Sequence, residues 1–106
     1  MPIYYLNFHR LVHRALERAG LRLEDVDHFV YSNISQTDRD GFIRAFRIPV
    51  DKAPYTKLAE YGHTFAADLI VNYTDLRREG RIRPGQILLF ASAGIGFTWG
   101  VSLARA

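Results

Sequence analysis

The chain has 106 residues, of which 48% are hydrophobic and 24% charged, with 8 Gly, 4 Pro and no Cys. These figures indicate one compact soluble domain, residues 1–106, and exclude a disordered tail, a collagen-like fibre and a disulfide scaffold. The net charge of +3 is spread along the chain, so we expect no nucleic-acid partner but leave an acidic protein partner open. No apolar run spans a membrane and no secretory signal begins the sequence, which predicts a cytoplasmic protein without a membrane partner.

The first part of the chain predicts a helix followed by a strand. Asn7 is placed to cap the helix, Gly20 to end it, and Leu21 to make the hydrophobic contact of a Schellman motif. The segment from Val26 to Tyr31 is too brief for a helix and predicts a strand. The helix carries one apolar stripe at helical spacing: Phe8, Leu11, Val12, Ala15, Leu16 and Ala19.

A second helix is predicted to begin at Ser35, which matches an N-terminal cap, and to end at Pro49. Gly41 inside this helix should cost about 1 kcal/mol relative to Ala. The segment from Tyr55 to Leu58 then predicts a short strand. The apolar residues that the second helix should bury are Phe42, Ile43 and Phe46.

Thr64 is placed to cap a third helix, which reaches about Arg78 and is closed by Gly80. Its apolar side chains cover most of the circumference, and only Asp68 and Asn72 share a polar edge. A helix of this kind is buried on more than one side, which a single sheet in so small a domain does not provide. We therefore expect a partner, or a further part of the polypeptide, to cover apolar side chains that are exposed in the isolated chain: Phe65, Leu69, Ile70 and Tyr73.

Two strands complete the pattern. Residues 86–92 contain a buried apolar run that follows a turn at residues 83–85, and residues 97–104 alternate between apolar and small or polar side chains with a period of two. Helices that alternate with buried strands, followed by two adjacent strands, predict an α/β fold with a mixed β-sheet and helices packed on it.

Two motifs suggest ligand binding at first sight, but their surroundings in the sequence argue against it. Gly94-Ile95-Gly96 follows a strand, but a strand and not a helix comes next, so a dinucleotide-binding turn is excluded. His9 and His13 have a spacing able to share a metal, yet both flank the apolar stripe, which favours solvated surface residues. His63 differs from them, because it precedes the third helix and feels the positive end of that helix.

Three segments carry a resemblance to a known family: residues 61–67 (Tyr-Gly-His-Thr-Phe-Ala-Ala), 80–86 (Gly-Arg-Ile-Arg-Pro-Gly-Gln) and 96–100 (Gly-Phe-Thr-Trp-Gly). Together they resemble the C-terminal end of the 3-oxoacyl-[acyl-carrier-protein] synthase III enzymes, which are ketosynthases of the thiolase superfamily. The resemblance runs over essentially the whole chain but matches only the last third of those proteins. It implies a thiolase-like half, with the nucleophilic Cys in an N-terminal half that this sequence lacks.

The catalytic residues of that family are a Cys, a His and an Asn. The resemblance places Ser32 where the family has its His, in a segment that reads Ser32-Asn33-Ile34-Ser35, and His63 where it has its Asn. Ser32 has no basic nitrogen, whereas His63 can act as a base near neutral pH. These departures disfavour decarboxylative condensation. They leave simple acyl transfer, with a Cys supplied elsewhere, His63 as base and an alcohol or amine as acceptor.

The resemblance also implies an acyl-site loop and a docking surface. In the family, a backbone N–H of a glycine loop helps to form the oxyanion hole, and the matching loop here is Gly94, Ile95 and Gly96. Basic residues around the second helix contact the acidic carrier protein or the phosphates of CoA. The residues in the matching region are Arg39, Arg44, Arg47 and Lys52.

The leading hypothesis is the C-terminal portion of a ketosynthase III-like acyltransferase of fatty acid or polyketide biosynthesis. It would move an acyl group from a CoA or acyl-carrier-protein thioester, which is a substrate and not a resident cofactor, and no metal is expected. The chain alone is not expected to be active, because its partner would be an N-terminal thiolase-fold half carrying the Cys, and a homo-oligomer is expected. Two alternatives stay open: a catalytically degenerate thiolase-fold subunit that scaffolds an active partner, and an unrelated small binding module.

Overall fold

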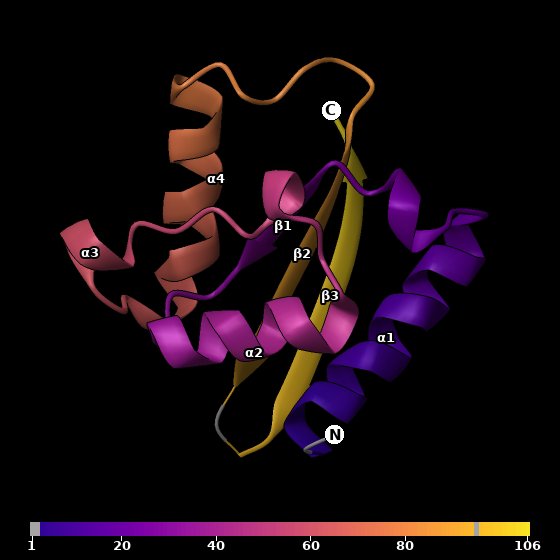
Figure 1. Cartoon of the computed structure of the whole chain (residues 1–106), viewed down its shortest axis with the longest axis horizontal. Coiled ribbons are helices and arrows are strands. Elements are labelled where there is room, and N and C mark those ends of the chain that lie inside the picture. The colour runs from indigo at the N-terminus through magenta and orange to yellow at the C-terminus, as the bar shows by residue number, and fades with distance from the viewer. Residues whose placement is uncertain (1–2, 95) are drawn as a thin grey trace.

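The computed structural model describes residues 3–94 and 96–106, and the side chain of residue 66 is not described. The three strands form one sheet, which lies between helices (Figure 1). The helices and strands are α1 (Ile3–Ala19), β1 (His28–Tyr31), α2 (Gln36–Phe46), α3 (Leu58–Tyr61), α4 (Asp68–Arg78), β2 (Ile87–Gly94) and β3 (Thr98–Arg105). Short 3₁₀ turns are η1 (Leu23–Asp25), η2 (Val50–Lys52) and η3 (Phe65–Ala67).

The sheet is mixed and its strand order is β1-β2-β3. Strand β1 runs parallel to β2, with Tyr31 opposite Ala91, and β2 pairs antiparallel with β3, with Gly94 opposite Thr98. The predicted α/β class with a mixed sheet is therefore confirmed. Among the described residues, no helix is both long and apolar enough to cross a membrane.

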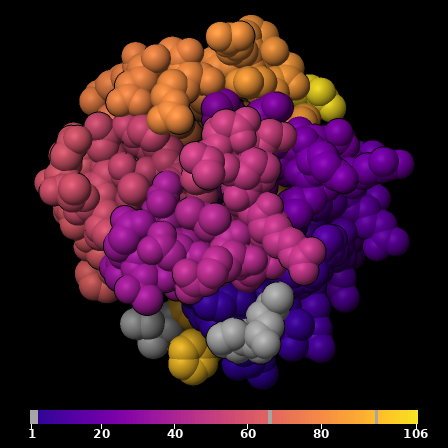
Figure 2. Space-filling view, in the orientation of Figure 1, coloured from indigo at the N-terminus to yellow at the C-terminus, as the bar shows by residue number. Residues whose placement is uncertain are grey.

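Helices cover both faces of the sheet, with α1 on one side and α4 on the other (Figure 1). Helix α2 and the segment after it fill the front of the molecule between them (Figure 2). The larger core joins α1 and α2 to one face of the sheet, and its buried residues include Phe8, Val12, Leu16, Phe29, Tyr31, Phe42, Phe46 and Leu89. The smaller core lies under α4 and consists of Val30, Leu76 and Leu88, with Leu69, Tyr73 and Phe90 packed against them.

Helix α1 ends as predicted but begins earlier. Gly20 has φ +68°, and the Leu21 N–H donates to the Leu16 carbonyl at 2.9 Å, which is the Schellman bond. The prediction that Asn7 caps the helix is wrong, because α1 already begins at Ile3. Residues upstream of Asn7, among them Tyr4, pack against the core and so extend the helix toward the N-terminus.

Helix α2 has the predicted cap but a different end. The Ser35 hydroxyl accepts a hydrogen bond from the Asp38 N–H at 3.0 Å, which confirms the N-terminal cap. The helix stops at Phe46, since Arg47 is left-handed with φ 51° and the Ile48 N–H donates to the Ile43 carbonyl at 3.0 Å. Pro49 is therefore not what ends it.

Gly41 is explained by a contact between α1 and α2. A Cβ atom added at Gly41 would lie 2.4 Å from the Tyr5 hydroxyl, which donates to the Asp38 carboxylate at 3.0 Å. The same carboxylate accepts a hydrogen bond from Tyr31 at 2.7 Å. Burial and these contacts raise the pKa of Tyr5 to about 12 and that of Tyr31 well above its ordinary value.

We expect Gly41→Ala to lower the free energy of unfolding by about 1–3 kcal/mol, because it overpacks the Tyr5 contact. Without that contact, Ala would stabilise the helix by about 1 kcal/mol. Urea melts of Gly41→Ala, Tyr5→Leu and the double variant measure the coupling. The explanation is wrong if Gly41→Ala costs as much in the Tyr5→Leu background as in the wild type.

The strand predicted at residues 55–58 is not formed. The Thr56 hydroxyl accepts a hydrogen bond from the Leu58 N–H at 3.1 Å, which is a local turn that competes with extended structure. Helix α3 then begins at Leu58.

The third predicted helix begins at Asp68, after the turn η3, and not at Thr64. The expectation of exposed apolar surface is confirmed for Phe65 and Ile70, which are 71% and 68% exposed. Leu69 and Tyr73 instead pack against the smaller core. The polar edge of this helix faces inward, because Asp68 and Asn72 are fully buried.

Candidate active site

Ser32 follows β1, and hydrogen bonds from the adjacent Asn33 through Asp68 connect its loop to His63. Parallel strands bring their carboxyl ends to one edge, so Ser32 after β1 lies at the same edge as the end of β2. The loop that follows β1 lies between the starts of α2 and α4 (Figure 1). A hydrogen bond of 2.8 Å from the Asn33 N–H to the Asp68 carboxylate joins this loop to α4.

His63 and Asp68 form a hydrogen-bonded pair at this edge. The His63 Nδ1 atom lies 2.5 Å from the Asp68 Oδ2 atom. The His63 side chain is 31% exposed, whereas the Asp68 side chain is fully buried. A carboxylate at Nδ1 fixes the neutral imidazole with its proton on Nδ1, so the lone pair is on Nε2. This arrangement orients His63 as a base.

Four donors surround the Asp68 carboxylate. One oxygen accepts hydrogen bonds from the Thr64 N–H at 2.7 Å and from the Thr64 hydroxyl at 2.6 Å. The other accepts from Asn33 and His63. Burial raises the pKa of Asp68, but these hydrogen bonds outweigh it and hold that pKa below its ordinary value. Asp68 is therefore a carboxylate at neutral pH.

The backbone before α4 is shaped to bring His63 and Asp68 together. Gly62 has φ +67°, a conformation that suits glycine and turns the chain after α3. Phe65 has φ +56°, which is rare for an aromatic residue and is typical of strained functional segments. Its ring centre lies 4.6 Å from that of His63.

Asp68 and Asn33 are the site residues that the sequence analysis missed. The available signal was that Asp68 and Asn72, four positions apart, are the polar residues in the apolar stretch 65–73. Ser32, which was predicted, is half-buried and stands next to Asn33 in the chain. Ser32 and His63 are thus linked through the hydrogen bonds of Asn33 and Asp68.

The predicted acyl-site loop is described only in part. Gly94 ends β2, and Gly96 is exposed with φ +115°, a backbone conformation that favours glycine. The prediction for Ile95 falls on a residue outside the described part of the chain.

The four predicted docking cations differ in their contacts. Arg39 donates through Nε to the Pro54 carbonyl at 2.9 Å, and Lys52 donates to the Glu24 carbonyl at 2.8 Å. Both therefore hold loops in place. Arg44 and Arg47 are exposed and are the better candidates for contact with an acidic partner.

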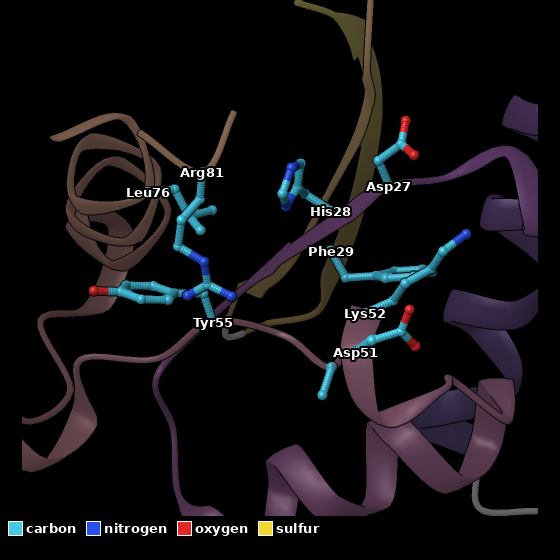
Figure 3. A pocket seen from close by; sticks show the side chains of 9 residues that line it. Asp27, His28, Phe29, Asp51, Lys52, Tyr55, Leu76 and Arg81 are labelled. Atoms are coloured by element: carbon cyan, nitrogen blue, oxygen red, sulfur yellow. The ribbon is translucent and has the colours of Figure 1, made fainter. Parts of the chain in front are cut away.

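Two hollows of the surface lie away from His63. One, shown in Figure 3, is at the start of β1 and has a volume of about 10 Å³, with Arg81 over the Tyr55 ring. Another, of about 180 Å³, lies between η1 and the end of α2. Neither is lined by His63 or Asp68.

The other histidines lie elsewhere. The Nε2 atoms of His9 and His13 are 3.3 Å apart, and burial together with His13 lowers the pKa of His9. His28 contacts Gln86 at 2.9 Å. Among residues 3–94 and 96–106, no group of three or more His, Cys, Asp or Glu side chains is arranged to hold a metal.

Comparison with known proteins identifies the family. The family model for the C-terminal part of 3-oxoacyl-[acyl-carrier-protein] synthase III matches residues 16–106. β-Ketoacyl-[acyl-carrier-protein] synthase III of Novosphingobium aromaticivorans is 34% identical over 99 residues, which are 93% of this chain and 30% of that protein.

Solved structures agree with this match. The synthase III of Pseudomonas aeruginosa has a TM-score of 0.82 at 27% identity, over 91% of this chain and 30% of that one. ChlB3, an acyltransferase, has a TM-score of 0.86 at 25% identity, over 97% of this chain and 31% of that one. The chain thus spans about 30% of the length of the curated relatives it matches. It belongs to the family of 3-oxoacyl-[acyl-carrier-protein] synthase III C-terminal domains and has their thiolase-like α/β fold.

Proposed function

We propose that this chain supplies the acid/base residues of a ketosynthase III-like acyltransferase. The enzyme would move an acyl group from a CoA or carrier-protein thioester to an alcohol or amine. The observation that carries the proposal is the His63–Asp68 pair, in which a buried carboxylate orients an accessible imidazole. This is the geometry of a general base in acyl transfer.

The reaction needs a nucleophile that this chain does not contain, since it has no Cys. In the proposed first step, His63 Nε2 takes the proton of a Cys thiol, the thiolate attacks the acyl thioester, and the His63 imidazolium returns the proton to the departing sulfur of the carrier. In the second, the neutral His63 takes the proton of the acceptor, which attacks the acyl-Cys, and the imidazolium returns that proton to the departing Cys sulfur. Asp68 stabilises the imidazolium in both steps. The thioester is the substrate, and no resident cofactor is required.

Acyl transfer fits these residues better than decarboxylative condensation does. Ser32 stands at the position of the family's His and offers only a hydroxyl, which can donate a hydrogen bond but cannot act as a base near pH 7. His63 stands at the position of the family's Asn and is paired with Asp68. The likeness to ChlB3, which is an acyltransferase, supports the same choice.

The surface around His63 supports a partner that completes the site. Tyr61, Phe65 and Ile70 are all more than half exposed, although large apolar side chains of this kind are usually buried. A thiolase-fold half that carries the Cys would cover them and bring the nucleophile to His63. The curated relatives, of which this chain spans about 30%, have room for such a half.

Intact-mass analysis of the complete assembly, incubated with a panel of acyl-CoAs, tests the proposal. We expect a mass increase equal to the acyl group, which is lost when an alcohol or amine acceptor is added and is absent when the nucleophilic Cys is replaced by Ala. Malonyl-CoA should give no release of CO₂. No adduct across the panel would instead favour the alternative, a degenerate subunit that scaffolds an active partner.

A charge-reversal variant tests the docking surface. We expect Arg44→Glu/Arg47→Glu to weaken the binding of an acidic carrier protein several-fold and to reduce its salt dependence, because fewer charges are paired across the interface. Affinity is measured by titration at low and high salt. Arg77→Glu/Arg78→Glu, at the far end of α4, makes the same change of net charge and should have a smaller effect. Unchanged affinity of the α2 variant at low salt would remove the docking role.

A further inference from the structure

We infer that Asn33 and Asn72 are positioning residues, which clamp the loop after β1 to α4 and thereby hold the Asp68 carboxylate in the plane that orients His63. The inference rests on the proposed role of His63.

The two side-chain amides form a closed pair in the core. Asn33 Nδ2 donates to Asn72 Oδ1 at 3.0 Å, and Asn72 Nδ2 donates back to Asn33 Oδ1 at 2.8 Å. Asn72 Nδ2 also donates to the Tyr31 carbonyl at 2.9 Å, and Asn33 Oδ1 also accepts from the Thr56 hydroxyl at 2.8 Å. Asn33 is 3% exposed and Asn72 is fully buried, so water does not compete for these bonds.

This pair acts on the dyad through the backbone of Asn33. Its N–H donates at 2.8 Å to Asp68 Oδ2, the same oxygen that meets the His63 Nδ1 atom. Asp68 and Asn72 are four residues apart on α4 and so share one face of the helix. Asn33 is therefore attached to α4 at two points: its backbone to Asp68 and its side chain to Asn72.

Because Asn33 is attached to α4 through both its backbone and its side chain, the direction of its backbone N–H is fixed. With the Asn33 side chain held, its N–H points at Asp68 Oδ2, and a rotation of the carboxylate would break that bond. The carboxylate plane in turn sets the direction of the imidazole ring. Because Ser32 precedes Asn33 in the same loop, the clamp also holds the backbone next to Ser32.

A purely apolar contact would fill this space without setting an orientation. Amides buried in a core stabilise it only when their polar atoms find partners, and the nearby packing residues Val30, Leu76 and Leu88 show that aliphatic side chains suit this side of the sheet. What the amide pair adds is a specified geometry between the loop and α4.

The test uses the His63 Nδ1 proton, observed by NMR on the full chain labelled with ¹⁵N-histidine. In the wild type we expect a far-downfield Nδ1–H resonance and a ring that is predominantly the Nδ1–H tautomer. Asn72→Asp keeps the size of the side chain but removes both of its donors, and should abolish the resonance and mix the tautomers. Leu76→Val, one helical turn further along α4 and without a polar contact, is the control and should keep both signals.

Asn33→Ala is the second variant, for the case in which Asn72→Asp does not fold. It keeps the backbone N–H and removes only the amide, so loss of the resonance shows that the side chain positions the backbone donor. In an active assembly the same variant should lower kcat by roughly ten- to a hundredfold with little change in KM. If the folded variants keep the resonance and the tautomer while melting at lower temperature, the residues are merely structural and the inference is overturned.

These outcomes are separate from those of the proposed function. A wild-type chain that shows the resonance and loses it in Asn33→Ala supports the clamp, even if no acyl group is transferred. A wild-type chain without the resonance overturns the clamp, because there is then no oriented dyad to hold.

Discussion

Replacing His63 by Ala in the complete enzyme should lower kcat by roughly a hundredfold or more, the usual scale for the loss of a general base. Replacing Ser32 by Ala should be milder, on the order of tenfold, as expected for one neutral hydrogen bond of about 1 kcal/mol. The difference follows from the site. His63 has a buried carboxylate at Nδ1, whereas Ser32 can only donate to or accept from a thioester or substrate hydroxyl.

Steady-state acyl-transfer rates of the two variants, measured with one donor and one acceptor, show which substitution lowers kcat more. His63 is 31% exposed, so its removal leaves little cavity, and circular dichroism with thermal melts should show a folded protein. His13→Ala, an exposed histidine on α1, controls for the loss of an imidazole as such. If both variants fold and Ser32→Ala is the more damaging, the assignment of roles is wrong.

Helix ends and strands were predicted correctly where the sequence signal lies within a few neighbouring residues. The end of α1 is specified by Gly20 and Leu21, and the start of α2 by Ser35 and Asp38, because each of these motifs closes its own hydrogen bonds. The apolar run of β2 and the alternation of β3 likewise depend on local periodicity. The sheet followed from these elements.

The sequence predictions were wrong where contacts between residues far apart in the chain, or competing side-chain hydrogen bonds, determine the local structure. Asn7 looked like a cap, but core packing of Tyr4 extends α1 past it. The segment at Thr56 looked like a strand, but its hydroxyl bonds to Leu58 and reaches Asn33. In each case a partner far along the chain, or a side chain that competes for a backbone bond, overrides the local pattern.

The candidate site shows the same division. The match to a family motif singled out Ser32 and His63, the proposed base. It did not single out Asp68, because periodicity shows that Asp68 and Asn72 share an edge of α4 but not which way that edge faces. The direction is set by Asn33, which is 35 and 39 residues away and was visible only as a neighbour of Ser32.

Asp68→Asn should have the largest effect on this chain, because it damages both catalysis and folding. The carboxylate accepts from four donors, and an amide group can accept on one side only. Its NH₂ group would then face the Asn33 N–H and donate to His63 Nδ1, which moves the imidazole proton to Nε2. A base with its lone pair turned away cannot act, and the equivalent change in serine proteases lowers kcat by about 10⁴. We expect kcat to fall by about 10³- to 10⁴-fold.

The free energy of unfolding should depend on pH differently in the wild type and in Asp68→Asn. The pKa of Asp68 is lowered by folding, so the ionised group stabilises the native state above the unfolded pKa, which is about 3.9. This contribution is lost as the pH falls through the lower, folded pKa. On acidification, the free energy of unfolding should therefore fall more in the wild type than in Asp68→Asn. At pH 7, the free energy of unfolding of the variant should be lower by about 1–3 kcal/mol for each donor left without an acceptor.

Urea melts of both proteins between neutral and acidic pH measure this difference. Asp75→Asn is the matched control, since it makes the same change on the same helix. In the described part of the chain, one oxygen of Asp75 is buried without a hydrogen-bond partner, so an amide there should cost little or stabilise the fold. Equal losses of stability for the two variants at pH 7, or an Asp68→Asn enzyme with wild-type kcat, would show that Asp68 fills space and does not orient His63.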